Sequence, residues 1–551
     1  MSDKVMPRAP PAYTPVEDIQ KIHDRLLNGF KSRKSRSIEY RKQQLAQLAY
    51  MLQDNHERFE HAFKLDFRRH LIDSHLAELG STHSAIVGCI NNLDEWTQTK
   101  PIPFNINAYF MSPKVRKEPK GVVLLIAPFN YPVLLGIGPM ATAIAAGNAV
   151  VLKPSELNIA TDALVAELFP KYLDPDMFAI VNGSIKETQK LLELRWDHIM
   201  FTGSPKVGKI VAEAAAKHLT PTTLELGGKS PVFIDGSAKG KNLKLAARRL
   251  AWGRFMNCGQ TCVAPDYILV PRDCQAEFIK EIKNALESMY PSSQGGPRQS
   301  ESYGRIISIG QLDRIKRLLD GTKGKIVAGG ESDREERFLA PTIVSDCDGA
   351  DSLMSEEIFG PVLPIVPVDS VEEALAFVNA REHPLSVMVF SNDDNFKQYV
   401  ADHTQSGSIM ANECLFQAAC EGLPFGGVGQ SGYGNHVGKY GFETFTHSRA
   451  SMDSPAWLDM KILYGSRYPP FRKEDLGTIK LIWGEGYVPY PRIGQSPSLR
   501  MRMAKVPWIK LLTIAVGAWA IKTQWWDLQP EGWVNAWLSG YWVQKLRMGW
   551  K

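Results

Sequence analysis

Short apolar runs alternate with helix-like stretches in the middle of the chain, and this alternation most strongly limits the possible fold. The apolar runs are Val122–Ala127, Ala149–Leu152, Phe178–Val181, His198–Thr202 and Val232–Ile234. Helical spacing occupies Met140–Ala146, Ala160–Leu168 and Val207–Leu219 between them. Strands that alternate with helices predict an α/β fold, in which a parallel sheet carries helices on both faces.

A second series of the same kind follows residue 235. Its predicted strands are Tyr267–Val270, Lys325–Val327, Val362–Val366, Ser386–Phe390 and Gly407–Ala411, and its predicted helices are Gln275–Met289 and Val371–Arg381. A chain of 551 residues is also too long for one ordinary core. We therefore predict two doubly wound α/β domains that meet near Gly227–Lys229, preceded by helices at Val16–Phe30 and Ile38–Phe67.

Charge and cysteine usage exclude several classes of function. Residues 500–551 hold eight Lys or Arg and two acids, while the whole chain has a net charge of +5, so the first 499 residues are nearly neutral. That balance does not suggest nucleic-acid binding. The seven cysteines show no CxxC pair or His/Cys ligand spacing, so we expect no metal site. No secretory signal pattern opens the chain, and we expect reduced thiols in a cytosol-facing compartment.

Cys262, Glu225 and Asn130 are the candidate catalytic residues. Cys262 ends a small, polar segment, and a cysteine acts as a nucleophile only where its surroundings favour the thiolate. Glu225 stands between two leucines, and apolar surroundings raise a carboxyl pKa enough for general-base catalysis. Asn130 follows a predicted strand, where its amide suits either an oxyanion or the turn itself. An inert core cysteine and a salt-bridged acid are the alternatives for Cys262 and Glu225.

Gly203 and Ser204 follow a predicted strand and precede a predicted helix. Small residues at such a turn let backbone N–H groups at a helix N-terminus approach a phosphate. An ordinary strand-to-helix connection would look the same, so this turn alone is weak support for a phosphate site.

Seven segments, in this order and spacing, resemble the aldehyde dehydrogenase superfamily. They are PFNYP from Pro128, AGNAVVLKPSE from Ala146, FTGS from Phe201, LELGGKSP from Leu224, NCGQTC from Asn257, EEIFGPVLP from Glu356 and LPFGGVGQSGYG from Leu423. The likeness covers residues 16–449. NCGQTCVAPDY, GKYGFETFTHSR and the late RYPP at residues 467–470 are similar to the class 3, or fatty aldehyde, branch.

The resemblance implies a role for each matched residue. Cys262 corresponds to the nucleophile, Glu225 to the base that activates the hydrolytic water, and Asn130, with the Cys262 backbone N–H, to the oxyanion hole. Cofactor contacts are implied for Lys153 and Glu156 at the adenosine ribose, Gly203 and Ser204 at the pyrophosphate, Glu357 at the nicotinamide ribose and Phe359 beside the nicotinamide ring. The implied reaction passes through a thiohemiacetal and a thioester on Cys262 to a carboxylic acid.

The resemblance also implies a domain plan. Residues 16–100 and 118–228 correspond to a Rossmann-like NAD-binding domain, and residues 229–425 correspond to a catalytic domain. Residues 101–117 and 434–450 correspond to bridging elements of a homodimer. Residues 451–504 would be a linker, and residues 505–551 a membrane-associating tail.

Three positions bear on cofactor and substrate preference. Glu156 places a negative charge where the ribose hydroxyls would bind, so we expect NAD in preference to NADP, although class 3 enzymes can use both. Pro205 stands where the family commonly has Thr, and it offers no N–H to a phosphate. Residues 411–421 lack the His usually found ahead of LPFGG, which leaves substrate preference open.

Tryptophan is concentrated at the end of the chain. Eight of the thirteen tryptophans lie between Trp508 and Trp550, among basic residues, and this combination favours a membrane–water interface. The apolar run Leu511–Ile521 is much shorter than the ~20 residues that cross a bilayer. We therefore expect a tail that lies in the interface rather than one that spans. A tail packed on a dimer partner is the alternative.

A membrane-held enzyme that faces the cytosol meets aldehydes that dissolve in lipid. Long-chain aliphatic aldehydes are therefore the expected substrates, with apocarotenoid or aromatic aldehydes as alternatives. The expected location is the endoplasmic reticulum, the mitochondrial outer membrane or a lipid droplet.

Three other functions fit parts of the pattern. An acylating enzyme would pass the thioester to coenzyme A, but such enzymes generally lack the hydrolytic Glu. A non-enzymatic membrane scaffold would not need Cys262, Glu225 and Asn130. A cysteine hydrolase would need a His partner, and no His lies in the motifs beside Cys262.

Overall fold

A computed structural model describes residues 11–105, 108–237, 240–459, 467–483, 490–491 and 493–496. The chain divides into two compact units. The larger unit contains the described residues up to 102 and from 113 to 451, and the smaller contains those of 103–112 and from 452 onward.

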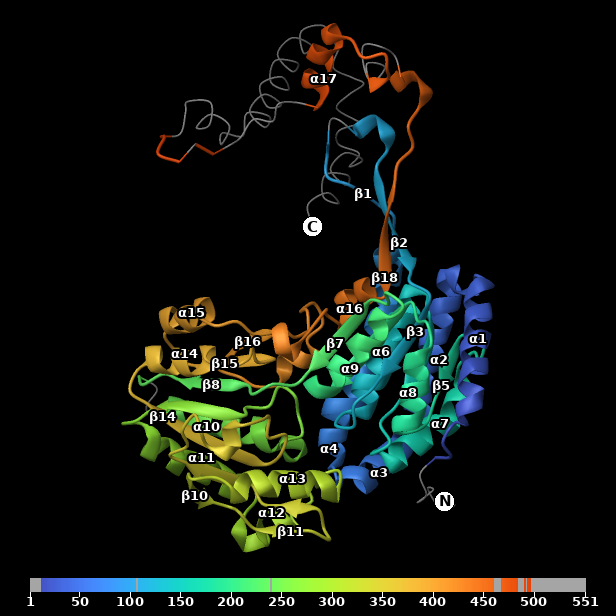
Figure 1. Ribbon diagram of the computed structural model, residues 1–551. Helices are drawn as coiled ribbons and strands as arrows, with labels where there is room; N and C mark the ends of the chain where they lie inside the picture. The colour runs from blue at the N-terminus through green and yellow to red at the C-terminus, as the bar shows by residue number, and fades with distance from the viewer. Residues whose placement is uncertain are drawn as a thin grey trace, which may run out of the picture. The chain divides into compact units, whose positions relative to one another are not determined.

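The first sheet has six strands in the order β17–β7–β6–β3–β4–β5 (Figure 1). Their bounds are β3 Val122–Ile126, β4 Ala149–Lys153, β5 Phe178–Ile180, β6 His198–Gly203, β7 Thr222–Leu226 and β17 Gly432–Tyr433. Strands β3 to β7 are parallel, as predicted, whereas β17 returns late in the chain and pairs antiparallel with β7. The sheet is therefore mixed rather than purely parallel.

Nine helices belong to this half of the larger unit. They are α1 Val16–Lys31, α2 Ile38–Asp54, α3 His56–Phe67, α4 Leu71–Ser74, α5 Gly80–Thr97, α6 Pro132–Ala146, α7 Ile159–Tyr172, α8 Ile185–Glu193 and α9 Pro205–Ala216. Helix α6 packs with α2 and α5, and α7 with α3, on one face of the sheet. Helix α1 packs on β3 and β4 and contacts α8, which contacts α9, on the other face.

The strand order reverses direction next to β3. From β3 the chain moves outward to β4 and β5, then crosses back to β6 and β7 on the other side of β3. Loops that leave the carboxyl ends of β3 and β6 therefore run in opposite directions and open a crevice. Such a switch point is where open α/β sheets bind their ligands.

The second sheet has seven strands in the order β10–β13–β14–β9–β8–β15–β16. Their bounds are β8 Pro231–Ile234, β9 Tyr267–Pro271, β10 Lys325–Ala328, β13 Thr342–Ser345, β14 Val362–Val368, β15 Ser386–Phe390 and β16 Ser408–Ala411. The longer helices of this half are α10 Lys241–Phe255, α11 Gln275–Met289, α13 Ile309–Asp320, α14 Val371–Asn379 and α15 Asp394–Asp402. Strand β10 is antiparallel to β13, so this sheet is also mixed.

The predicted strands and most predicted helices are confirmed, but the segment Ile38–Phe67 is divided at Asn55 into α2 and α3. Other elements were missed. Strand β7 was not predicted, because it is only five residues long and contains two threonines and Glu225, so it forms no apolar run. Helix α6 begins at Pro132, well before the predicted Met140, and helices α5 and α10 were not predicted. The two sheets have separate hydrophobic cores, and the chain passes from one to the other between β7 and β8.

The predicted bridging segments form a separate antiparallel sheet of β1 Lys100–Pro101, β2 Lys114–Pro119 and β18 Thr446–Ser451. Helix α16 Gly438–Thr444 precedes β18 and packs on α5 and α6. The predicted linker contains helix α17 Leu476–Trp483. The predicted tail lies outside the described residues, and none of the described helices is long and apolar enough to cross a membrane.

Gly432 allows β17 to pair closely with β7. Its φ is +119°, and a Cβ at this position would lie 1.9 Å from the Leu224 carbonyl oxygen. We expect Gly432→Ala to lower the free energy of unfolding by about 1–3 kcal/mol, the usual cost of overpacking. Urea unfolding followed by circular dichroism measures this change.

Gly138 provides the matched control for this substitution. It lies inside α6, and a Cβ there would have no neighbour within 4 Å. Gly138→Ala should therefore leave stability unchanged or raise it by up to about 1 kcal/mol. Equal changes in unfolding free energy for the two substitutions would contradict the close approach of β17 to β7.

Candidate active site

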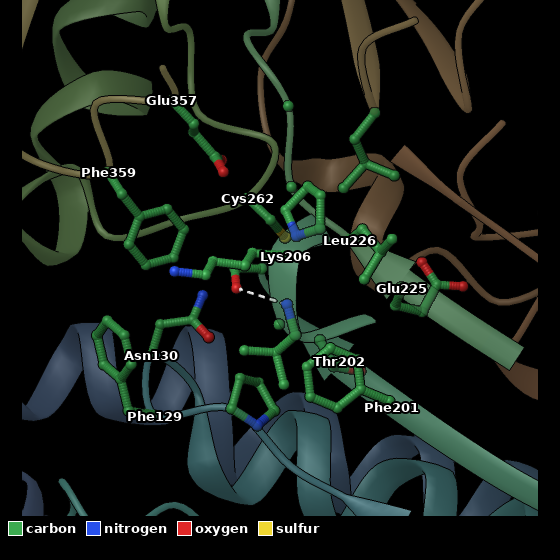
Figure 2. Close-up of a pocket in the computed structure, with 18 of the residues that line it drawn as sticks. Phe129, Asn130, Phe201, Thr202, Lys206, Glu225, Leu226, Cys262, Glu357 and Phe359 are labelled. Atoms are coloured by element: carbon green, nitrogen blue, oxygen red, sulfur yellow. Dashed lines mark hydrogen bonds between the residues drawn. The ribbon is translucent and has the colours of Figure 1, made fainter. Parts of the chain in front are cut away.

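All nine predicted site residues line one cleft of about 1390 Å³ in the larger unit. They are Asn130, Lys153, Glu156, Gly203, Ser204, Glu225, Cys262, Glu357 and Phe359. Figure 2 labels Asn130, Glu225, Cys262, Glu357 and Phe359 among them. The cleft begins at the carboxyl ends of β3, β4 and β6, at the reversal of strand order, and continues to the loops around Cys262 and Phe359. The structure thus brings together residues from both sheets, and their individual roles remain predictions.

Cys262 follows a tightly wound loop at the end of α10. Asn257, Cys258 and Gly259 all have positive φ, at 51°, 54° and 73°. Gly259 is required there, because a Cβ would lie 2.3 Å from the Gly360 carbonyl oxygen. Burial, together with the nearby carboxylates of Glu357 and Glu225, raises the pKa of the Cys262 thiol to about 12. The thiol is therefore protonated in this structure.

Asn130 lies in the loop between β3 and α6 and is 2% exposed. Its side-chain nitrogen Nδ2 has no hydrogen-bond partner among the residues that the structure describes. A buried donor without a partner typically costs 1–3 kcal/mol, so such a group is uncommon unless a ligand completes it. In Figure 2 this amide extends into the cleft that Cys262 lines, where it can donate to a ligand oxygen.

Glu225 lies on β7 and is 3% exposed. Neither of its carboxylate oxygens has a hydrogen-bond partner in the described part of the chain, and burial raises its pKa well above the usual carboxyl value. The predicted alternative, a salt-bridged acid, is therefore wrong. The carboxylate points away from Cys262 in Figure 2, so a change of rotamer is needed before it can reach a water beside the sulfur.

Lys153 and Glu156 lie at the end of the cleft beside β4. The Lys153 ammonium donates to the Pro154 carbonyl at 2.7 Å and to Glu156 Oε2 at 3.3 Å. Lys153 is buried, whereas the Glu156 side chain is 36% exposed. The pair offers a cation and a carboxylate at a single position, which suits the hydroxyl groups of a sugar.

Gly203 ends β6, and Ser204 is the N-cap of α9. A Cβ on Gly203 would lie 2.5 Å from the Phe201 ring, so a larger residue would require that ring to move. Ser204 Oγ accepts a hydrogen bond from the Val207 N–H at 3.4 Å. Pro205 is the first helical residue, where its ring suits the backbone but supplies no N–H.

Glu357 and Phe359 lie in the loop before β14. Burial raises the pKa of Glu357 to about 8, against a backbone hydrogen bond from Gly228 that lowers it. The Phe359 ring meets the Phe129 ring edge-on, with their centroids 5.7 Å apart. Lys229 holds the start of this loop by donating to the carbonyls of Leu353 at 2.7 Å and Glu356 at 3.0 Å.

The donor set of the cleft fits a nicotinamide dinucleotide. The Lys153–Glu156 pair suits the adenosine ribose, and the glycine turn at the N-terminus of α9 suits a pyrophosphate. Glu357 offers an acceptor for a second ribose, and the rings of Phe129 and Phe359 offer a flat apolar wall. Within the described residues no group of three or more His, Cys, Asp or Glu could hold a metal ion.

The local sequence did not single out several cleft residues. His436 lines the same cleft as Cys262, although it follows the last motif and lies far from Cys262 in the chain. It is 5% exposed, its Nε2 has no hydrogen-bond partner among the described residues, and burial lowers its pKa to about 4. A histidine thus lines the cleft together with Cys262, although none lies in the motifs beside Cys262 in the sequence. Lys206 and Phe129 also line the cleft. Sequence analysis made no prediction for them beyond their position close to Ser204 and Asn130 in the chain.

Known proteins resemble this chain over most of its length. The model of the aldehyde dehydrogenase family matches residues 8–451. Aldehyde dehydrogenase family 3 member A2 of Rattus norvegicus is 44% identical over 451 residues, which is 81% of this chain and 90% of the relative. The dimeric NADP-preferring aldehyde dehydrogenase of Canis lupus familiaris is 42% identical over 82% of this chain and 98% of its own length.

Solved structures show the same fold. The substrate-bound state of Staphylococcus aureus AldH has a TM-score of 0.81 and 37% identity, over 84% of this chain and 99% of that one. Mycobacterium tuberculosis aldehyde dehydrogenase complexed with NAD+ has a TM-score of 0.71 and 27% identity, over 80% and 91%. The cleft geometry, the family match and these relatives agree, and the chain belongs to the aldehyde dehydrogenase family of oxidoreductases.

Proposed function

We propose that this enzyme oxidises long-chain aliphatic aldehydes to carboxylic acids with NAD, through a covalent intermediate on Cys262, at a membrane surface. One observation carries the catalytic part of the proposal. A thiol, an unpartnered buried amide and an unpartnered buried carboxyl line the same cleft, next to groups that suit a dinucleotide.

The first half of the reaction uses Cys262 and Asn130. The Cys262 sulfur, once deprotonated, forms a bond to the aldehyde carbon, and the carbonyl oxygen becomes an alkoxide. The Asn130 amide donates a hydrogen bond to that oxygen, a contribution usually worth ~2.7–4 kcal/mol in the transition state. A dinucleotide held by Glu357 and Phe359 would supply the acceptor for the hydride that leaves this carbon. The product of this half is a thioester on Cys262.

The second half uses Glu225 and water. The raised pKa of Glu225 makes its ionised carboxylate a stronger base than an ordinary glutamate. It takes a proton from water as the water oxygen attacks the thioester carbon, and the acid leaves as the Cys262 sulfur is released. Because burial raises the pKa of Glu225, hydrolysis should become faster as pH rises through that raised pKa.

A second cavity supports a long hydrocarbon substrate. It has a volume of about 440 Å³ and shares Leu135 and His436 with the main cleft. Much of its wall is apolar, including Leu76, Leu134 and Val437. An alkyl chain whose carbonyl lies near Cys262 could extend into this space. Apocarotenoid and aromatic aldehydes are the second candidate substrates, since the same walls suit them.

The Trp-rich, basic segment from residue 505 supports a membrane location that faces the cytosol. The reason is chemical, because aldehydes with long chains partition into lipid and are met at its surface. The relative named dimeric supports a homodimer, and the antiparallel sheet of β1, β2 and β18 is the element proposed to join the two copies.

NAD is the proposed cofactor in preference to NADP. The Glu156 carboxylate would repel a 2′-phosphate, but its pairing with Lys153 weakens that repulsion. One relative is named NADP-preferring, and a solved relative was complexed with NAD+. NADP is therefore the weaker alternative rather than an excluded one.

Glu225→Gln removes the proposed base and keeps the size of the side chain. We expect the first-turnover burst of NADH to remain, while steady-state kcat falls by about 10²–10⁴-fold, the usual contribution of a general base. The rise of kcat with pH should disappear together with the carboxyl group. Stopped-flow absorbance and the intact mass of the acyl-enzyme measure these outcomes.

Cys262→Ala is the control for this prediction, and it should abolish the burst as well. A full wild-type kcat in Glu225→Gln would remove Glu225 from the hydrolytic step.

Glu156→Gln removes the charge opposed to a 2′-phosphate. Two charges about 4 Å apart near a protein surface interact by roughly 1–4 kcal/mol, so relative kcat/KM for NADP over NAD should rise on the order of tenfold or more. Steady-state kinetics with both cofactors and one aldehyde give this ratio. Glu193→Gln, an exposed acid that is not among the residues lining the cleft, is the control. An unchanged ratio would show that Glu156 does not select the cofactor.

The substrate and membrane proposals are tested by one series of assays. We expect kcat/KM to rise from hexanal to hexadecanal in the presence of lipid vesicles. A chain that ends at residue 504 should lose vesicle binding and this rise, but keep its activity on hexanal. Truncation without effect on vesicle binding or on the rise of kcat/KM would overturn the membrane proposal.

Coenzyme A thioesters among the products would instead support an acylating enzyme.

A further inference from the structure

Asn130 and Cys262 lie on separate loops, and a single guanidinium lies between those loops. Arg69 follows α3, and its side chain is only 2% exposed. No local sequence pattern singles it out. Its surroundings are the loop that carries Asn130, the loop that carries Cys262 and the first turn of α6.

The guanidinium of Arg69 bonds both loops directly. Its Nη2 donates to the Asn130 carbonyl oxygen at 2.8 Å and to Asn257 Oδ1 at 2.8 Å. Asn257 Nδ2 in turn donates to the same Asn130 carbonyl at 3.0 Å and to the Gln260 carbonyl at 3.2 Å. The oxyanion loop and the nucleophile loop therefore share a hydrogen-bonded network centred on one residue.

Glu78 fixes the orientation of Arg69. Arg69 Nη1 donates to Glu78 Oε1 at 2.7 Å, and the Glu78 side chain is fully buried. The other oxygen, Oε2, accepts the N–H groups of Val133 at 3.0 Å and Leu134 at 2.8 Å, in the first turn of α6. A carboxylate at a helix N-terminus is favourably placed. The Arg69–Glu78 ion pair is thus hydrogen-bonded to the start of α6, the helix that begins just after Asn130.

Aromatic contacts complete this arrangement. The guanidinium carbon of Arg69 lies 4.4 Å from the Phe67 ring centroid and 5.1 Å from that of Tyr131. The Tyr131 hydroxyl lies 2.6 Å from Thr261 Oγ1. Tyr131 and Thr261 are the sequence neighbours of Asn130 and Cys262, so a second bridge joins the same two loops.

We propose that Arg69 is a positioning residue that sets the spacing between the Asn130 amide and the Cys262 sulfur. The inference rests on the proposed roles of these two residues. Arg69 does not line the cleft, and it acts through Asn130 and Asn257. A planar, forked guanidinium is needed, because it bonds three acceptors in one plane, whereas a lysine ammonium has one nitrogen and a different geometry.

The test is a double-mutant cycle of Arg69→Lys and Asn130→Ala. Because a displacement of about 1 Å can cost roughly 100-fold in rate, Arg69→Lys should lower kcat by about that factor. It should leave NAD binding, measured by quenching of tryptophan fluorescence, unchanged. In the Asn130→Ala background the further loss should fall below about tenfold, since the group being positioned is already absent.

Equal loss factors in the two backgrounds would overturn the positioning role. Failure of the underlying function is distinguishable, because in that case Asn130→Ala alone would leave kcat unchanged. If Arg69→Lys does not fold, Asn257→Ala replaces it in the same cycle with the same expected coupling.

Arg41 is the matched control for a buried arginine. Arg41 lies on α2, is 6% exposed and donates hydrogen bonds to the backbone carbonyls of Ser35 and Ala145. Neither of these two acceptor residues lines the cleft. Arg41→Lys should lower the melting temperature but leave kcat unchanged and show no coupling to Asn130→Ala. A coupling as large as that of Arg69 would indicate a general loss of stability and would also overturn the proposal.

Discussion

Polar groups buried without partners define this active site. The Asn130 amide nitrogen and both oxygens of Glu225 are buried and make no hydrogen bond. Each such group typically costs 1–3 kcal/mol, and a stable fold keeps few of them. Here two hydrophobic cores, one under each sheet, offset that cost. The unmet hydrogen bonds are therefore available to a substrate oxygen and to water.

The same burial that prepares these groups also sets their protonation. It raises the pKa of Glu225 well above its usual range and that of Cys262 to about 12, so the cleft favours neutral acids over ions. The proposed mechanism would then require deprotonation within the site, and a rotamer change that turns Glu225 toward the sulfur. The fully buried Arg69–Glu78 pair shows the opposite solution, in which two charges satisfy each other and hold two loops together.

Prediction from sequence worked best where the period of the apolar residues was clear. The strands β3, β4 and β6, and helices such as α11, follow directly from their apolar spacing. Strand β7 did not, because its two threonines and Glu225 leave it without an apolar run. The antiparallel pairing of β10 with β13 and of β17 with β7 could not be predicted either. The sequence of a short strand does not fix the direction in which it pairs with its neighbour.

The sequence by itself determined the family and the alternating α/β order, and it selected Cys262, Glu225 and Asn130 as candidate catalytic residues, because these depend on local periodicity and on motifs of neighbouring residues. Only the tertiary structure decided which distant groups meet. It placed His436 in the cleft and Arg69 between two loops that are far apart in the chain. The physical reason is that burial and hydrogen-bond partners arise when the sheets and helices pack together, and no single segment of sequence contains them.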